Sequence, residues 1–319
     1  RTPDGVTVIG LYSSDWYVST SGTEEALGYF PSSPRKLLSM LKDSRVVAGD
    51  VVHAAAGVYR GESDLLITGA DTTIPACAPI RSGITLMADD GPEMTVIEGE
   101  GSTTLDVDND WKLGPQAVRC VWLADKAKVS GFTLRGGRTR SVAGAHYTCD
   151  NSGGGVLGPM NSRLAQAYVE NCVISNCASF RGGAARYVTL VNCRIFDNYA
   201  QYNSAIAGES RLFGCVADRN VCQNNPVYEY LSIDNCTFGS GNCTATGSQL
   251  LCPSSPYKDA WVRNTIALGP VETNKADRGW YQNCFATKAS SPCSGLTIVE
   301  PARLQIDADY RPIKGMCEA

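Results

Sequence analysis

The sequence has very few histidines, no Cys-x-x-Cys pair and no excess of basic residues. Only two histidines, His53 and His146, occur in 319 residues, so ligands for a zinc site are scarce. No apolar run approaches the ~18 residues of a membrane-spanning helix, and we expect no membrane span. The net charge of −4 provides no basic field for nucleic acid or an anionic membrane. These absences argue against zinc enzymes, membrane-spanning proteins and nucleic-acid-binding proteins.

Cysteine, by contrast, is abundant. The chain has 14 cysteines, an even and high number that favours an oxidising compartment. The sequence opens at Arg1 with a polar stretch and shows no signal peptide. We therefore expect a secreted or cell-surface protein whose leader has already been removed.

Four of the cysteines mark a repeat of 21 or 22 residues. They are Cys172, Cys193, Cys215 and Cys236. Mostly apolar residues recur three positions before each cysteine, namely Val169, Leu190, Leu212 and Ile233. They recur again two positions after it, namely Ile174, Ile195, Ala217 and Phe238. In each repeat, apolar residues alternate with other residues before and after a break in the pattern. This predicts two short strands per repeat that meet at a corner. A repeat of this length must stack on its neighbours, which predicts an all-β chain with one parallel β-solenoid rung per repeat.

The position just before each cysteine holds asparagine in three repeats and glycine in the fourth. The residues are Asn171, Asn192, Gly214 and Asn235. Both residue types accept left-handed backbone, which suits a tight corner. Stacked every ~4.8 Å, these amides should also bond one another, so we expect a structural ladder of asparagine beside the cysteine row.

The pattern divides the chain into three regions. Residues 1–50 hold a strand and then a short helix over 34–43, with Ser32 or Ser33 expected as its cap and Leu37, Leu38 and Leu41 on one face. This helix is expected to cover the open first rung. Residues 51–290 should form about ten rungs, and residues 291–319 read as an ending segment.

Several motifs resemble secreted bacterial right-handed parallel β-helix proteins of the pectate-lyase-like fold. They are GDVVHAAAGVY at 49–59, GPEMTVIEG at 91–99, VSGFTL at 129–134 and DYRPIKG at 309–315. The glycine runs at 153–155 and 182–183 are similar to repeats of adhesin and autotransporter passengers. The resemblance implies a right-handed parallel β-helix and a bacterial source, but not a function, because this fold hosts lyases, hydrolases, adhesins and fibre proteins.

The resemblance also directs the search for chemistry. Lyases of this fold hold calcium with acidic residues on one face, and Asp106, Asp108 and Asp110 alternate onto one side of an extended segment. We name calcium as the only candidate cofactor; the alternative is a solvated acidic strand face. Glycoside hydrolases of this fold carry a Gly-His-Gly motif, which the sequence lacks. His146 lies in a loop by composition and is a weak catalytic candidate.

A second catalytic candidate is the pair Asp197 and Arg219. Both stand four residues after a repeat cysteine, so they should lie ~4.8 Å apart in adjacent rungs. They are either an acid–base pair in a shallow groove or, more commonly for such positions, a cross-strand ion pair that fixes register.

The cysteines leave three alternatives open. Cysteines five or seven residues apart could bridge a corner within a rung, and cysteines in adjacent rungs could bridge vertically. The row could also stay reduced, because a free cysteine packs as a small apolar residue.

From these patterns we favour a structural or adhesive extracellular protein over an enzyme. The chain should present a rigid, disulfide-stabilised surface to glycans or to copies of itself. The short apolar segment that includes Val6, Val8 and Ile9 is the candidate for self-association into a filament, by adding a strand to the end of another molecule. The alternative is a polysaccharide lyase or glycoside hydrolase acting in a groove. A row of charged residues repeated over three rungs would favour that alternative.

Overall fold

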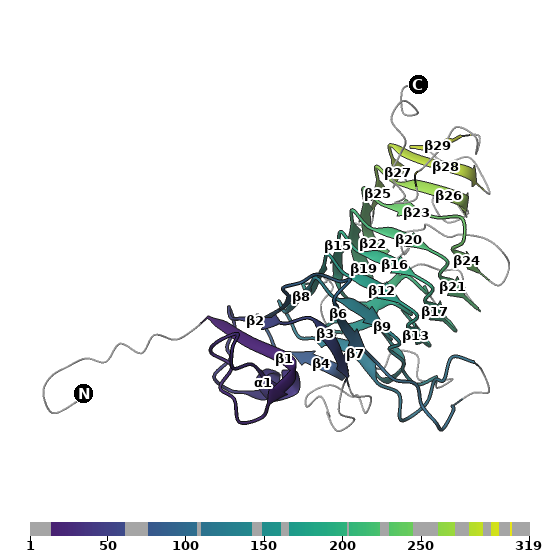
Figure 1. The fold of residues 1–319 in the computed structure, drawn as a ribbon. Helices are drawn as coiled ribbons and strands as arrows, with labels where there is room; N and C mark the ends of the chain where they lie inside the picture. The colour runs from purple at the N-terminus through teal and green to yellow at the C-terminus, as the bar shows by residue number, and fades with distance from the viewer. Residues whose placement is uncertain are drawn as a thin grey trace, which may run out of the picture.

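The computed structural model describes most of the chain as stacked parallel strands. It describes residues 14–60, 76–106, 110–141, 149–160, 166–202, 204–223, 230–244, 261–271, 281–289, 295–299 and 307. Figure 1 shows an elongated stack of rungs with β1 and α1 at one end and β28 and β29 at the other. All the strand pairs are parallel, and the predicted parallel β-helix is therefore confirmed.

Two ten-stranded sheets run the length of the stack. Sheet A is formed by β1 (Asp15–Thr23), β2 (Val51–Ala54), β5 (Thr85–Ala88), β8 (Lys128–Ser130), β11 (Tyr168–Glu170), β15 (Thr189–Val191), β19 (Ser210–Phe213), β22 (Tyr230–Asp234), β25 (Trp261–Arg263) and β27 (Tyr281–Gln282). Sheet B is formed by β3 (Gly57–Arg60), β6 (Thr95–Glu98), β9 (Thr133–Arg135), β12 (Val173–Ser175), β16 (Arg194–Phe196), β20 (Val216–Asp218), β23 (Thr237–Phe238), β26 (Ile266–Val271), β28 (Cys284–Ala289) and β29 (Leu296–Ile298).

Two shorter sheets complete the rungs. Sheet C is formed by β4 (Ala76–Ile80), β7 (Arg119–Leu123), β10 (Val156–Leu157), β14 (Ala185–Arg186) and β18 (Ala207–Gly208). The short sheet is formed by β13 (Ala178–Ser179), β17 (Tyr199–Ala200), β21 (Val221–Cys222) and β24 (Cys243–Thr244). In the central rungs the chain passes from sheet A to sheet B, then to the short sheet, then to sheet C. A 3-10 turn, η1 (Cys149–Asn151), precedes β10.

The core is built from the residue rows that the repeat predicts. Leu190 and Leu212 are register partners on β15 and β19, and both are fully buried, as expected. Ile174 and Ile195 are the corresponding buried partners on β12 and β16. The side chains of these rows join one continuous hydrophobic cluster.

The corner between sheets A and B has the expected left-handed backbone. Asn171, Asn192 and Asn235 have φ of 51°, 52° and 50°, and Gly214 has φ of 63°. These corner asparagines are exposed to solvent. Further along the row, the side chain of Asn283 donates to Asn264 Oδ1 at 3.3 Å. The buried asparagine ladder, however, lies in a different row, described below.

The N-terminal helix is shorter than expected. Helix α1 (Leu37–Lys42) begins after Lys36, which makes no side-chain capping bond, so the predicted serine cap is wrong. Its buried residues are Leu37, Met40 and Leu41, and the helix contacts β1 and β4 (Figure 1). The Arg81 side chain donates hydrogen bonds to the Leu41 and Val46 carbonyls and so fixes the segment after the helix. A role for α1 as cover of the first rung stays a prediction.

Candidate functional site

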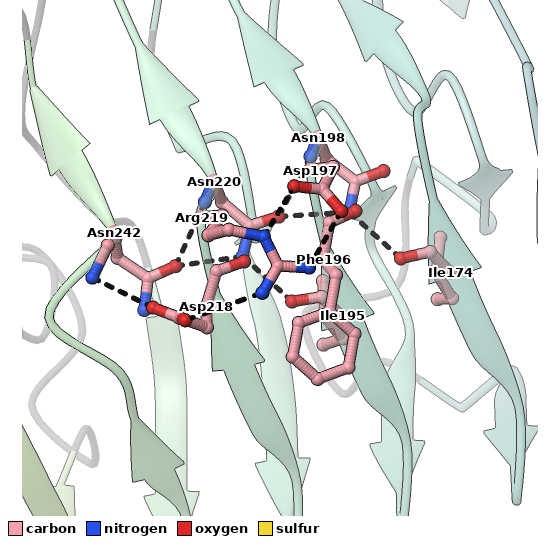
Figure 2. A network of polar contacts seen from close by, with 10 residues as sticks. Ile174, Ile195, Phe196, Asp197, Asn198, Asp218, Arg219, Asn220 and Asn242 are labelled. Atoms are coloured by element: carbon pink, nitrogen blue, oxygen red, sulfur yellow. Dashed lines mark hydrogen bonds and ion pairs between the residues drawn. The ribbon is translucent and has the colours of Figure 1, made fainter. Parts of the chain in front are cut away.

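The first candidate pair, Asp197 and Arg219, is brought together at the corner that follows sheet B. Arg219 donates from Nε to Asp197 Oδ1 at 2.8 Å and from Nη2 to Oδ2 at 2.9 Å (Figure 2). Its guanidinium also lies over the Phe196 ring, 5.2 Å from the centroid. Both carboxylate oxygens are thus used by a two-pronged ion pair between adjacent rungs. This is the geometry of the register-fixing alternative.

Next to this ion pair lies a buried ladder of asparagines that the sequence analysis missed. Figure 2 shows Asn198, Asn220 and Asn242 on successive rungs, each amide bonded to the next. The Nδ2 of Asn198 donates to Asn220 Oδ1 at 2.9 Å, and the Nδ2 of Asn220 donates to Asn242 Oδ1 at 2.8 Å. Each amide also bonds backbone carbonyls of its own rung and of the preceding rung, for example the Ile195 carbonyl at 2.8 Å from Asn220. The ladder therefore ties neighbouring rungs together in the interior.

The acidic cluster is only partly covered by the described residues. Asp106 accepts a hydrogen bond from the Ser141 backbone amide at 2.8 Å. It also forms an ion pair with Arg140 at 3.3 Å. Asp110 is exposed, while Asp108 lies outside the described residues. No group of metal-ligating side chains occurs in the described part of the chain. Calcium binding stays a prediction. His146 and the Val6–Ile9 segment also lie outside the described residues.

Six cysteines of the core are reduced. Cys120, Cys172, Cys177, Cys193, Cys215 and Cys236 are free and buried. The structure thus shows the reduced alternative for these six, and no disulfide is found among the described residues. Each thiol of the repeat row donates to a backbone carbonyl; Cys172 Sγ, for example, donates to Glu170 O at 3.1 Å. Burial raises the pKa of Cys172 to about 12, so this thiol is not a nucleophile at neutral pH.

A shallow groove on the outer face of sheet A is a candidate for ligand binding. It has a volume of about 430 Å³ and is lined by Lys126, Gln166, Tyr168 and Arg211. Strand alternation turns Tyr168 and Arg211 outward, because their neighbours Val169 and Leu212 face the core. Tyr168 is 38 % exposed, so its ring is available to a ligand.

The cations of this groove have no acidic partner among the residues that the structure describes. Among the described residues, neither Lys126 nor Arg211 forms an ion pair, whereas the neighbouring Lys128 is paired with Glu170 at 3.1 Å. On consecutive strands of sheet A, Tyr168 is in register with Thr189, and Thr189 with Arg211. At ~4.8 Å per strand, two steps separate the tyrosine from the arginine by roughly 10 Å along the solenoid. The groove therefore combines an exposed ring, an amide and two uncompensated cations.

The same outward row continues toward the C-terminal end. Arg211 is in register with Ser232, and Ser232 with Trp261. The Trp261 ring lies 6.3 Å from the Phe213 ring and 4.3 Å from the Arg263 guanidinium. Sheet A thus presents aromatic and basic side chains from β11 to β25, a stretch of four inter-strand steps.

A row of three charged residues lies on sheet B. Glu98 on β6 accepts from Arg60 Nε at 2.7 Å and from Arg135 Nε at 2.8 Å, across three adjacent rungs. Burial raises the pKa of Glu98, but the hydrogen bonds from Arg60 and Arg135 outweigh it and leave the pKa lowered. A cavity of about 250 Å³ lies here, with Arg60, Glu98 and Glu100 in its wall. This is the three-rung charged row that the sequence analysis named as favouring a catalytic groove.

None of these three features, the asparagine ladder, the outward row of sheet A and the charged row of sheet B, was predicted from the sequence. The buried asparagines do carry a signal, since residues 198, 220 and 242 are spaced by 22 residues. The outward row of sheet A carries none, because Tyr168, Thr189 and Arg211 share neither size nor charge. The row on sheet B joins residues 60, 98 and 135, which lie outside the regular repeat.

Comparison with known proteins gives weak structural likenesses. No protein-family model matches the sequence, and no curated protein matches it. A rhamnogalacturonan lyase structure is 14 % identical over 87 % of this chain and 73 % of its own, with a TM-score of 0.44. Pectin methylesterases from Erwinia chrysanthemi and Yersinia enterocolitica are each 13 % identical, with TM-scores of 0.42 and 0.41. The alignments cover 90 % and 86 % of this chain and 93 % of each esterase. The fold assignment rests on the strand order and register of the chain itself.

Proposed function

We propose that this protein binds an acidic polysaccharide along the outer face of sheet A and acts as an extracellular adhesive protein. The observation that carries the proposal is the groove in which Lys126 and Arg211, which form no ion pair within the described part of the chain, flank the exposed ring of Tyr168. Guanidinium and ammonium groups bind carboxylate or sulfate, and guanidinium does so in two-pronged geometry. The tyrosine offers a flat apolar surface with a polar tip, and the Gln166 amide offers a donor and an acceptor for sugar hydroxyls.

The shape of the surface favours a polymer over a small molecule. The aromatic and basic side chains extend from Tyr168 to Trp261, roughly 19 Å at ~4.8 Å per strand step. The protein as a whole carries a net charge of −4, so the basic row is a local feature. Local positive charge on an acidic protein selects acidic ligands at that face while repelling them elsewhere.

Binding experiments with a polyuronate test this function. Affinity electrophoresis or calorimetry should show that polygalacturonate binds and that neutral dextran does not, with affinity falling as salt rises. The double variant Lys126→Gln/Arg211→Gln should bind at least tenfold more weakly, because charge-assisted hydrogen bonds contribute ~1.5–3 kcal/mol each. Arg219→Gln is a control, since that arginine is exposed but already bonded to Asp197. Equal loss in both variants, or binding of dextran as tightly as polygalacturonate, would contradict the proposal.

The cavity on sheet B supports a second candidate function, a polysaccharide lyase or glycoside hydrolase. Glu98 and Glu100 supply two carboxylates to one cavity, and the lowered pKa of Glu98 favours the ionised form that a nucleophile requires. The proton donor would then have to be Glu100. Incubation with polyuronates and neutral glycans, followed by assays for unsaturated products and new reducing ends, tests this function. Turnover that is lost in Glu98→Gln would favour the enzyme over the adhesive protein.

A further inference from the structure

His53 lies between two carboxylates at the N-terminal end of sheet A. Its Nδ1 is 2.7 Å from Asp89 Oδ1, and its Nε2 is 3.2 Å from Asp15 Oδ1. Its ring stacks on Tyr17, with centroids 5.1 Å apart and planes 21° apart. Asp15 and Tyr17 belong to β1, His53 to β2, and Asp89 directly follows β5. One imidazole therefore joins the first three strands of the sheet.

The protonation state of the ring decides whether both contacts are hydrogen bonds. Ionised carboxylates only accept hydrogen bonds, and a neutral imidazole has a single N–H. Only the imidazolium can donate a hydrogen bond to both Asp15 and Asp89, because it carries an N–H on each nitrogen. When the ring is neutral, one carboxylate faces a nitrogen lone pair instead, and that contact becomes repulsive. The two carboxylates flank opposite ring nitrogens, so the three groups cannot share one metal ion.

The contacts of His53 matter for stability because β1 lies at the edge of sheet A. β1 is the edge strand of sheet A, and its neighbour within the sheet is β2. On its other side, isolated bridges join Val18 and Thr23 to Arg35. Edge strands open more readily than central strands because fewer partners hold them. A side-chain link from β1 to β2 and to the end of β5 therefore acts where the sheet is weakest.

We propose that His53 is a pH-dependent clasp that fastens the first strand to the β-helix when it is protonated and loosens that strand when it is neutral. The groups that face the ring are Asp15 and Tyr17 from β1 and Asp89 from the segment after β5; its register partner Met87 on β5 is uncharged. Burial lowers the pKa of His53, but the hydrogen bonds to Asp89 and Asp15 outweigh it, so the pKa lies above the ordinary 6.5.

The sign of the effect follows from linkage. A group whose pKa is raised on folding stabilises the folded state fully below its unfolded pKa. That stabilisation is lost as the pH rises through the raised value. The window of change therefore starts near 6.5 and extends upward.

Hydrogen exchange of β1 tests the clasp. We expect the protection of peptides covering residues 15–23, corrected for intrinsic exchange rates, to fall severalfold between pH 5.5 and pH 8.5. His53→Gln should show weak protection that no longer changes over this range. His146→Gln is the matched control and should behave as the unchanged protein does, while leaving His53 as the only imidazole for an NMR titration.

A second variant keeps the test decisive if His53→Gln folds poorly. Asp89→Asn retains the ring but removes one charged acceptor, and it should lower the pKa of His53 and shift the loss of protection to lower pH. The clasp is refuted if His53 titrates at or below 6.5 by NMR. It is equally refuted if β1 protection in the unchanged protein does not vary with pH.

Discussion

Replacing Asn220 by leucine should destabilise the rungs around it severely. The Asn220 Nδ2 donates to Ile195 O at 2.8 Å and to Asp218 O at 3.0 Å, and its Oδ1 accepts from the Asn198 amide at 3.1 Å. Leucine has the same branched shape and number of side-chain heavy atoms but neither donor nor acceptor, so these three backbone groups lose a partner in the interior. Each buried group left without a partner costs ~1–3 kcal/mol. With three such groups affected we expect a loss of at least ~3 kcal/mol, which is a large share of the stability of an ordinary domain.

The neighbouring residue provides a matched comparison. Arg219→Gln removes an ion pair whose side chains are 54 % and 51 % exposed, and exposed pairs contribute at most about 1 kcal/mol. Urea unfolding measures both losses, and native-state hydrogen exchange of residues 195–220 locates them within the stack. The hydrogen-bond argument fails if Asn220→Leu is within 1 kcal/mol of the unchanged protein or no less stable than Arg219→Gln.

Three further predictions concern the core, the thiols and assembly. Leu212→Asp should abolish the cooperative melting transition seen by circular dichroism, because an unpaired buried carboxylate costs several kcal/mol; an unchanged melting temperature would contradict the register. The folded protein should resist alkylation at pH 8, and unfolding without reductant should expose at least six reactive thiols; fewer would show that the core cysteines are bridged. Deleting residues 1–13 should abolish high-mass species in light scattering and leave the circular dichroism unchanged. A full-length protein that is monomeric at high concentration would refute self-association.

The sequence was most informative where each rung repeats the same physical requirement. Leu190 and Leu212 must fill the same inward position on successive strands, so similar residues recur and the register could be predicted. The corner positions likewise require left-handed backbone, which restricts Asn192 and Gly214 to the few residue types that accept it.

Outward rows could not be predicted in the same way. The packing of the rung does not constrain an outward side chain, so Tyr168 and Arg211 follow no common pattern. The prediction of a serine cap failed for a different reason. Serine is a good cap in isolation, but Leu37 and Met40 are buried and the helix packs on β1 and β4, so tertiary packing outweighs the local capping preference. The ladder through Asn198 was missed because the repeats were aligned on the cysteine row. In the rung before Asn198, the corresponding position holds Cys177 instead of asparagine.

Hydroxyl-radical footprinting with bound polygalacturonate tests the proposed function most directly, because it reports where the polymer lies. The account predicts protection of Tyr168, Phe213 and Trp261 on sheet A, and unchanged oxidation of Phe30, which is 66 % exposed and distant in sequence from the groove. Protection should disappear in Lys126→Gln/Arg211→Gln. Binding without protection on sheet A, or with protection at Val58 beside Arg60 on sheet B instead, would contradict the assignment of the binding face.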